Sequence, residues 1–369
     1  MPLEVVDLFA GAGGLSLGFT AAGARVILAV EGNAHAAATY AANHPDSAVL
    51  TERIHQRWDV TARLDDLVGR TSCDILIGGP PCQGWSTLGH RADDARRKRM
   101  NAGVSLFLRQ AELLLPPAVV MENVRGLAVK AGGAYLSRAQ ARLRRAGYRV
   151  SSYDVRASDF GVPQLRHRVF MVGLREDLGL EFELEATHDE SEWLTVWDAI
   201  GDLPSIEAGE SAATYAGRAT TDLQRRLRCR RRRLTLHQAP DHSAQIMKVL
   251  RALADEGASR VDVEAEVELT SGFHNTYCRL RSDFPAPAVT SSAGRISSGR
   301  NAHPFDDRAL TPREAARLQT FPDSYEWRGP GRWSIYEQIG NAVPPTLAGA
   351  VARQLMDQLG PALELTEAA

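Results

Sequence analysis

The sequence is poor in cysteine, and the few cysteines follow no pattern. Cys73, Cys82, Cys229 and Cys278 show neither regular spacing nor the pairing typical of metal ligands, so the sequence indicates no disulfide framework and no zinc site. No apolar run approaches the length that spans a bilayer, and the first residues lack the pattern of a signal peptide. These absences predict a protein of the reducing cytoplasm that binds neither a membrane nor a metal.

The chain also lacks a large excess of either charge. Its 43 Lys and Arg residues and 45 Asp and Glu residues give a net charge of -2. The arginines are nevertheless unevenly spread, with a run from Arg225 to Arg233, a cluster from Arg96 to Arg99 and another from Arg138 to Arg149. Binding of a polyanion requires a local positive face rather than a positive total. Each cluster by itself is equally well explained as a solvated surface or a flexible tail.

Apolar segments alternate with helical patterns through the first half of the chain. The pattern predicts strands over residues 5–9, 26–31, 75–78, 119–122 and 168–173, and helices over 15–22, 34–43, 104–115 and 135–146. This alternation favours an α/β fold, a parallel or mostly parallel sheet with helices on both faces. Ligands of such sheets bind at the carboxyl ends of the strands.

The pattern changes in the second half, which predicts a smaller second domain. We expect a catalytic and cofactor-binding domain over residues 1–185, a small domain over 186–333, and a C-terminal segment, 334–369, that returns to the first domain. Helical periodicity reappears over residues 311–319, where Thr311 can cap the helix and Pro312 can open it.

Three short motifs carry groups with catalytic chemistry. Cys82 lies in a Pro-bounded loop after an apolar strand and is a candidate nucleophile. Glu122 ends the next apolar strand and is a candidate proton donor, while Arg166 and Arg168 can clamp an anionic or carbonyl-rich substrate. Each has a plainer explanation: a buried small side chain for the cysteine, a surface ion pair for the glutamate, and ordinary surface residues for the arginines.

A glycine turn follows the first predicted strand, in the segment from Asp7 to Gly14. Glycines at this place let a nucleotide-like cofactor approach the backbone. Taken alone, the turn does not distinguish S-adenosyl-L-methionine from a dinucleotide.

Taken together and in this order, the motifs resemble those of the DNA (cytosine-5)-methyltransferase family of the bacterial type. The resemblance covers nearly the whole chain except the middle of the second domain. It implies a Rossmann-like fold that binds S-adenosyl-L-methionine, with a target-recognition domain scaffolded by the stretch from Arg313 to Tyr325. It also implies that the cofactor is held by Phe9, Gly11, Gly13, Glu31, Asp59, Val60 and Asn341, with Glu31 on the ribose and Asp59 on the adenine amino group.

The same resemblance assigns roles around the substrate base. Cys82, Glu122, Arg166 and Arg168 match the family's catalytic residues, with Arg168 on the base carbonyl and Arg166 supporting phosphate or the catalytic loop. The residues expected to line the substrate site are Pro81, Gln83, Asn123 and Gln164, of which Asn123 holds the cysteine loop. One departure is Gly32, which stands where some members place a bulky side chain against the adenine.

The family chemistry explains why these residue types occur together. A thiolate from Cys82 adds to carbon 6 of cytosine, Glu122 protonates nitrogen 3, and carbon 5 then becomes able to accept a methyl group. The base must leave the duplex to meet the thiolate. The expected partner is therefore double-stranded DNA. Two roles are open at this point: one beside a cognate restriction endonuclease, and one as an orphan epigenetic methylase.

Two alternatives remain. A branch of the same family methylates tRNA, but the Cys-Phe-Thr signature of that branch is missing from this sequence. The other is a DNA- or RNA-binding protein that kept the fold and lost the reaction, which the intact Cys82, Glu122 and Arg168 argue against. The recognised DNA sequence cannot be read from the segment between Arg168 and Thr311.

Overall fold

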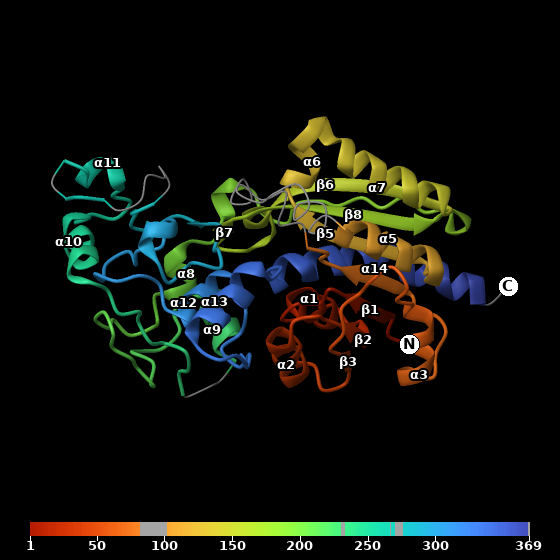
Figure 1. Ribbon diagram of the computed structural model, residues 1–369, viewed down its shortest axis with the longest axis horizontal. Helices are drawn as coiled ribbons and strands as arrows, with labels where there is room; N and C mark the ends of the chain where they lie inside the picture. The colour runs from red at the N-terminus through yellow and green to blue at the C-terminus, as the bar shows by residue number, and fades with distance from the viewer. Residues whose placement is uncertain (82–101, 230–232, 266, 270–275, 368–369) are drawn as a thin grey trace. The chain divides into compact units, whose positions relative to one another are not determined.

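The computed structural model describes residues 1–81, 102–229, 233–265, 267–269 and 276–367 (Figure 1). The chain forms two compact units, which are described separately. Unit 1 comprises Met1–Arg156, His167–Thr187 and Pro345–Ala369. Unit 2 comprises Ala157–Arg166 and His188–Pro344. The sequence predicted a small domain over residues 186–333. Unit 2 also contains residues 157–166, and it ends at Pro344, where the chain returns to unit 1.

Unit 1 is built on a sheet that, within the described residues, has seven strands in the order β3-β2-β1-β4-β5-β8-β6. β8 runs antiparallel to both of its neighbours, and the other pairs are parallel. The strands are β1 (Glu4–Leu8), β2 (Arg25–Val30), β3 (Ala48–Leu50), β4 (Ile75–Gly78), β5 (Ala118–Val124), β6 (Tyr148–Arg156) and β8 (His167–Arg175). Because β1 pairs with β2 on one side and with β4 on the other, the strand order reverses beside β1, which is where open α/β sheets bind ligands.

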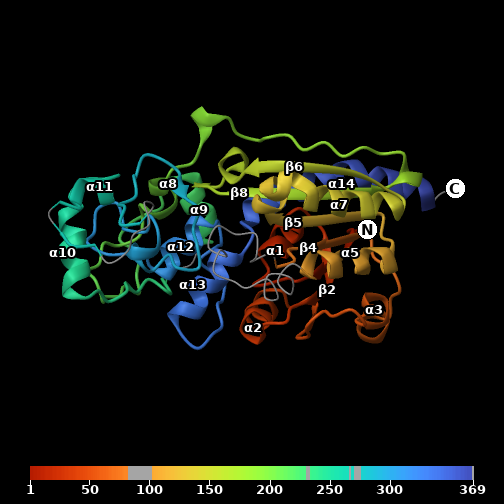
Figure 2. The same cartoon turned by 45° about the horizontal axis from the view of Figure 1, so that its top comes forward.

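Helices cover both faces of this sheet (Figures 1 and 2). One face carries α3, α5 and α7, and the other carries α1, α2 and α14. On the second face, α14 packs along α1. The helices of unit 1 are α1 (Gly14–Ala21), α2 (Ala34–Asn43), α3 (Val60–Val68), α5 (Ala102–Leu114), α6 (Gly126–Val129), α7 (Ala134–Arg145) and α14 (Pro345–Glu367). The central strands are buried on both faces, which explains why they read as continuous apolar runs.

The close packing of α1 on α14 depends on one glycine. A Cβ atom added at Gly18 would lie 2.4 Å from the Cβ of Ala348 and 2.5 Å from the backbone nitrogen of Gly349. Any larger residue at this position must therefore push the two helices apart. The end of the chain thus completes the helical layer that begins directly after the glycine turn.

The predicted α/β class is confirmed. In unit 1, the described elements that the sequence did not predict are β3, α3, α6 and β6. β6 has only two buried residues, at Tyr148 and Val155, and carries serine and aspartate between them. A strand at the edge of a sheet needs no apolar run, so this one gave no clear signal.

Unit 2 has little regular structure, and its described part is organised around short helices. Its elements are β7 (Gln164–Leu165), β9 (Ala286–Pro287), α8 (Val196–Ile200), α9 (Asp222–Arg228), α10 (Ala244–Ala252), α11 (Arg260–Val263), α12 (Pro312–Leu318) and α13 (Arg332–Asn341). The expected helix after Thr311 is α12. Thr311 caps it and Pro312 opens it, as the sequence predicted, and Glu314 completes a reciprocal capping box.

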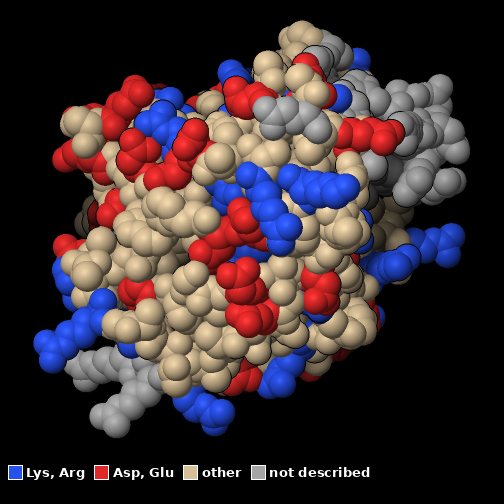
Figure 3. All heavy atoms as spheres, turned by 90° about the vertical axis from the view of Figure 1, so that its left-hand side faces the viewer, with Lys and Arg blue, Asp and Glu red and all other residues tan. Residues whose placement is uncertain are grey.

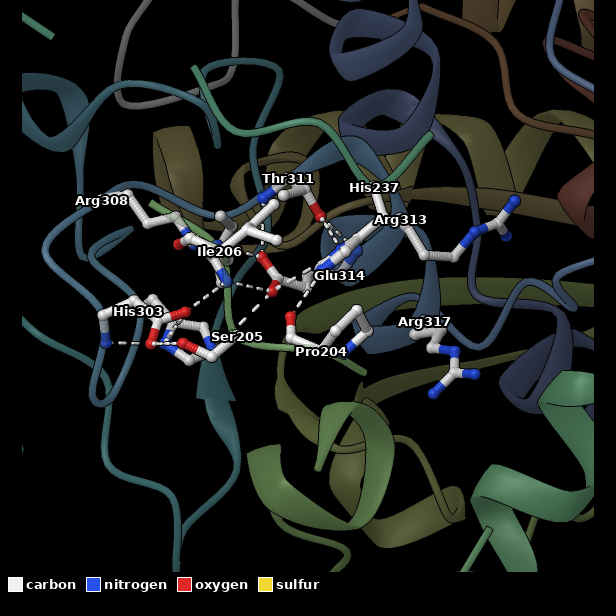
Figure 4. A network of polar contacts seen from close by, with 12 residues as sticks. Pro204, Ser205, Ile206, His237, His303, Arg308, Thr311, Arg313, Glu314 and Arg317 are labelled. Carbon is white, nitrogen blue, oxygen red and sulfur yellow. Dashed lines mark hydrogen bonds and ion pairs between the residues drawn. The ribbon is translucent and has the colours of Figure 1, made fainter. Parts of the chain in front are cut away.

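Buried ion pairs hold α12 in place (Figure 4). Glu314 accepts hydrogen bonds from both terminal nitrogens of Arg308, at 2.9 and 2.8 Å, and from the backbone N–H of Thr311. Burial alone would raise the pKa of Glu314, but the Arg308 guanidinium outweighs it and holds the pKa well below the usual range. Burial lowers the pKa of the neighbouring His303 to about 4. Unit 2 is therefore scaffolded partly by charge pairs inside its core.

The surface of unit 2 shows both charge signs. On the face seen in Figure 3, arginine and lysine side chains lie interspersed with aspartate and glutamate. In the part of the chain that the structure describes, no helix is long and apolar enough to cross a membrane. The same residues contain no group of His, Cys, Asp or Glu arranged to hold a metal ion.

Candidate active site

The glycine turn after β1 has a backbone that few residues tolerate. Gly11 and Gly13 have positive φ angles of 57° and 91°, and Phe9 has one of 58°. Glycine adopts this left-handed region without cost, whereas a phenylalanine there is strained. Backbone strain of this kind is commonly stored at functional sites. The turn ends at Gly13, which opens α1 without a side-chain cap.

Glu31 ties this turn to the carboxyl end of β2. One carboxylate oxygen accepts the N–H of Gly11 at 2.8 Å, and the other accepts the N–H of Asn33 at 2.6 Å. Each oxygen retains a second lone pair that can accept a hydroxyl group. Glu31 therefore fixes the shape of the turn and can still bind a ligand beside it.

Asp59 and Val60 lie at the beginning of α3, a helix that packs against β2. Asp59 caps the helix and accepts hydrogen bonds from the backbone and hydroxyl of Thr61, which hold the pKa of the carboxyl group below its usual value. The N–H of Val60 donates to the side chain of Gln110 at 2.9 Å, and Gln110 in turn donates to the carbonyl of Trp58. Gln110, which the sequence did not single out, thus anchors this segment to α5.

A buried polar chain lies next to the glycine turn and was also missed. The hydroxyl of Tyr40 donates to Ser16 at 2.7 Å, and Ser16 donates to Asp7 at 2.6 Å. Burial raises the pKa of Asp7 to about 8, and the negative charge of Glu31 adds to the shift. The second oxygen of Asp7 is buried and has no hydrogen-bond partner among the residues that the structure describes. The sequence marks Asp7 only as part of the glycine-turn motif, because its hydrogen-bond partners come from α1 and α2.

Glu122 and Arg168 meet on the other side of the β1–β4 junction. Glu122 is near the end of β5, and Arg168 is near the start of β8. Their side chains form an ion pair with 2.6 Å between Nε and the carboxylate, and both side chains are largely buried. Because β8 is antiparallel, its first residues lie at the same edge as the carboxyl ends of the parallel strands. This reversal brings the arginine to the glutamate.

The loop after β4 begins beside the same carboxylate. A Cβ at Gly79 would lie 3.5 Å from Glu122. Asn123 donates from its side chain to the carbonyl of Pro80 at 3.2 Å, so the end of β5 holds the start of this loop. The exposed Pro81 packs closely against Gly103 of α5. Cys82 and Gln83, expected to carry the nucleophile and to line the substrate site, lie outside the described residues, as does the cluster from Arg96 to Arg99.

Three of the expected site residues belong to unit 2. Arg166 is buried and donates to the backbone carbonyls of Val289, Gly340 and Ala342, so its guanidinium joins segments of that unit. Gln164 is also buried, and it binds backbone and side-chain groups of the same unit. Asn341 is exposed at the end of α13.

The described residues of unit 1 therefore fall into two groups around β1. One group lies after β1, after β2 and before α3, and comprises Phe9, Gly11, Gly13, Glu31 and Asp59. The other group lies on β5 and β8, and comprises Glu122, Asn123 and Arg168. The first group offers backbone and carboxylate acceptors to a polar ligand. The second offers a carboxyl group and a cation to a ring with a carbonyl.

Known proteins resemble this chain over nearly its whole length. A family model for C-5 cytosine-specific DNA methylases matches residues 3–357. The Type II methyltransferase M1.HphI of Haemophilus parahaemolyticus is 35% identical over 364 residues, which cover 96% of this chain and 87% of that protein. The Type II methyltransferase M.DdeI of Desulfomicrobium norvegicum is 35% identical over 378 residues, covering 96% and 88%.

Solved structures show the same fold. A candidate DNA modification methyltransferase encoded within a prophage, from E. coli, superposes with a TM-score of 0.78 at 27% identity, covering 97% of this chain and 99% of the other. Spodoptera frugiperda DNMT2 superposes with a TM-score of 0.58 at 16% identity, covering 97% and 99%, a likeness of fold alone.

Proposed function

The chain belongs to the family of C-5 cytosine-specific DNA methylases, and we propose that it methylates carbon 5 of a flipped cytosine in duplex DNA, using S-adenosyl-L-methionine and a covalent Cys82 adduct. The observation that carries this proposal is the buried ion pair of Glu122 and Arg168 at the strand edge where the cysteine loop begins. The relatives named Type II methyltransferases further support a role beside a cognate restriction endonuclease.

The residues around the glycine turn fit an adenosyl cofactor. Glu31 is a carboxylate with free lone pairs beside a turn whose backbone is open to a ligand, and Asp59 offers a second carboxylate beyond it. In this assignment Glu31 binds the ribose hydroxyls, Asp59 and Val60 face the adenine, and Phe9, Gly11 and Gly13 line the remainder. When bound, S-adenosyl-L-methionine supplies an electrophilic methyl group carried on sulfur. Asn341 of unit 2 is proposed as a further contact on the basis of family resemblance alone.

The proposed chemistry on cytosine follows from the second group of residues. The Cys82 thiolate forms a bond to carbon 6 of the ring, and Glu122 donates a proton to nitrogen 3, which takes up the displaced electron pair. Carbon 5 thereby becomes a nucleophile that can accept a methyl group. Loss of the carbon-5 proton to solvent, return of the nitrogen-3 proton to Glu122 and cleavage of the carbon–sulfur bond restore the aromatic ring and the thiolate.

Arg168 has two tasks in this scheme. Its Nε faces Glu122, while a terminal nitrogen donates to the carbonyl of His167 at 2.7 Å, so the guanidinium is held in one orientation. From there the remaining donors can bind the carbonyl oxygen of cytosine and draw electron density from the ring. Arg166 and Gln164 act in this proposal through the segments of unit 2 that they hold, rather than by contact with the base.

A mechanism-based adduct tests the proposal directly. Duplexes of varied sequence that contain 5-fluorocytosine should trap the enzyme in the presence of the methyl donor, because fluorine at carbon 5 cannot leave as a proton does. The expected result is a denaturation-resistant protein–DNA complex with wild-type protein and none with Cys82→Ser, although this variant still binds the donor in calorimetry. An equally abundant adduct with the variant would remove Cys82 as the nucleophile. Transfer to total tRNA but to no duplex would favour the RNA-directed alternative.

A further inference from the structure

One surface segment of unit 2, residues 290–300, is held unusually firmly for a loop. It runs against α13 with its backbone in direct contact, since a Cβ at Gly340 would lie 2.2 Å from the nitrogen of Ser291. A Cβ at Gly294 would likewise lie 2.6 Å from the ring of Tyr336. Side chains larger than hydrogen at these two glycines are excluded, so the loop follows the helix surface closely.

Hydrogen bonds and buried side chains fix the same segment from within. The side chain of Asn301, itself buried, donates to the carbonyls of Ser292 at 3.2 Å and Arg295 at 3.0 Å. Ile296 lies in the hydrophobic cluster that includes Val249 and Leu250 of α10, and its carbonyl accepts the N–H of Tyr277. The loop is therefore preorganised, and its exposed side chains start from a backbone of fixed position.

The loop presents the guanidinium of Arg295 to solvent. This side chain is exposed, and its guanidinium carbon lies 4.3 Å from the centre of the Trp333 ring, at the start of α13. Trp333 is itself 43% exposed. This distance fits a guanidinium that lies flat on the indole, an arrangement that keeps the N–H donors free at the edge because they lie in the plane of the group.

The charge of Arg295 is not used elsewhere in the described structure. Other arginines of unit 2 pair with carboxylates, as Arg279 does with Asp307 and Arg281 with Asp283. Arg295 and the exposed Arg300 form no ion pair with any described carboxylate. The segment also carries Ser291 and Ser298 at its surface, two hydroxyl groups suited to phosphate oxygens.

From these contacts we infer that Arg295 reads one base pair of the target DNA, with Trp333 as the platform that orients it. The inference rests on the proposed action on duplex DNA. A planar fork of donors held at a fixed angle matches the two acceptors of guanine in the major groove, oxygen 6 and nitrogen 7. Holding the fork in advance reduces the ordering that binding requires. Arg300 and the serines then contact the sugar–phosphate backbone beside it.

The test compares the methylated sequence motifs of matched variants. Sequencing of DNA from cells that express the wild-type protein gives its motif, which should include a G·C pair at the position Arg295 reads. Arg295→Lys keeps the charge and the carbon chain but loses the planar fork, so discrimination at that one position should fall about 10- to 100-fold in kcat/KM on duplexes differing by one base pair. Trp333→Ala should relax the same position, and Trp333→Phe should restore it.

A control variant separates base reading from general charge. Arg251→Ala on α10 removes an exposed arginine that also has no ion pair among the described residues, and it should leave the motif unchanged. If Arg295→Lys keeps the wild-type motif at every position, the base-reading role is wrong, whether or not overall binding weakens. A uniform loss of affinity across all duplexes with Arg295→Ala, with a reduced salt dependence, would assign the residue to a phosphate instead.

Two further outcomes are distinguishable. If the wild-type protein methylates no duplex DNA, the proposed function fails before the variants are compared. Thermal unfolding of each variant shows whether it folds. Should Arg295→Ala be unstable, the conservative Arg295→Lys and Trp333→Phe variants decide the question by themselves.

Discussion

Asp7 combines complete burial with an incompletely satisfied carboxyl group. Its pKa of about 8 means that the folded protein keeps a proton on this group at neutral pH, while the unfolded chain loses it near the ordinary value of 3.8. Between these two values the unfolded state binds fewer protons than the folded state. The free energy of unfolding should therefore decrease as pH rises from about 4 to about 8, and then level off with respect to this group.

Asp7→Asn removes that pH dependence. The amide keeps an acceptor for Ser16 and never carries the buried charge, so the variant should gain stability relative to wild type by an amount of the order of a few kcal/mol near pH 8, and far less near pH 4. Urea unfolding at several pH values measures this difference. Asp46→Asn, at an exposed carboxylate, serves as the control. A pH-independent difference between Asp7→Asn and wild type would contradict the assignment.

Among the described residues, Glu122 is the one whose chemistry the proposed reaction most directly requires. Glu122→Gln preserves the size of the side chain but cannot transfer the proton, so turnover should fall by about 100- to 10,000-fold while binding of the methyl donor is retained. Single-turnover methylation of duplex DNA gives the rate. The control is Glu112→Gln. This variant removes a carboxylate that also forms an ion pair with an arginine, Arg142, and it should have little effect on the rate. Near-wild-type rates for Glu122→Gln would show that another group protonates the ring.

Among elements, the pairing of α1 with α14 makes the sharpest prediction. In Gly18→Ala the added methyl group meets Ala348 and backbone atoms that cannot rotate away, so we expect a loss of about 1–3 kcal/mol in unfolding free energy. Chemical denaturation measures the loss. Gly217→Ala, at a glycine outside any helix whose added Cβ would meet no atom within 4 Å, should be nearly neutral. Equal effects of the two substitutions on the unfolding free energy would mean that the close packing of α1 on α14 does not make Gly18 necessary.

The elements also show how far sequence reasoning reaches. The strand ends that carry Glu31 and Glu122 were predicted because continuous apolar runs such as residues 75–78 mark buried parallel strands. The reversal of β8 was not predicted, since a local pattern does not encode the direction in which a strand runs. The buried role of Arg166 was equally invisible, because its partners lie more than a hundred residues away in sequence. Cys82 lies outside the described residues, and its role remains a prediction.

At the scale of the whole molecule, arginine content overstates the charge available to DNA. Arg166, Arg308, Arg313 and Arg317 are fully buried and bind carbonyls or carboxylates inside unit 2. Several surface arginines are paired as well, such as Arg25 and Arg70 with Glu4. Phosphate binding must then come from a smaller set of unpaired arginines. The run from Arg225 to Arg233 includes residues 230–232, which lie outside the described part of the chain.

Salt dependence of DNA binding tests this distribution. Replacing Arg230 and Arg231 with glutamine should weaken binding across all duplex sequences and reduce the slope of log affinity against log salt by about one for each lost phosphate contact. Replacing Arg25 and Arg70 changes the net charge by the same amount and should leave the slope unchanged, because both belong to an existing ion pair. Identical slopes in the two double variants would make the arginine run a surface feature without a binding role.

Unit 1 is assembled from three separate stretches of chain, and the last of them, α14, covers the helix that opens after the glycine turn. During synthesis on the ribosome, α1 therefore emerges long before its covering helix exists. The face of α1 that packs on α14 therefore stays exposed until unit 2 has been translated. Nascent chains halted before Pro345 should accordingly recruit chaperones, and cofactor-site formation should be among the final events of biogenesis.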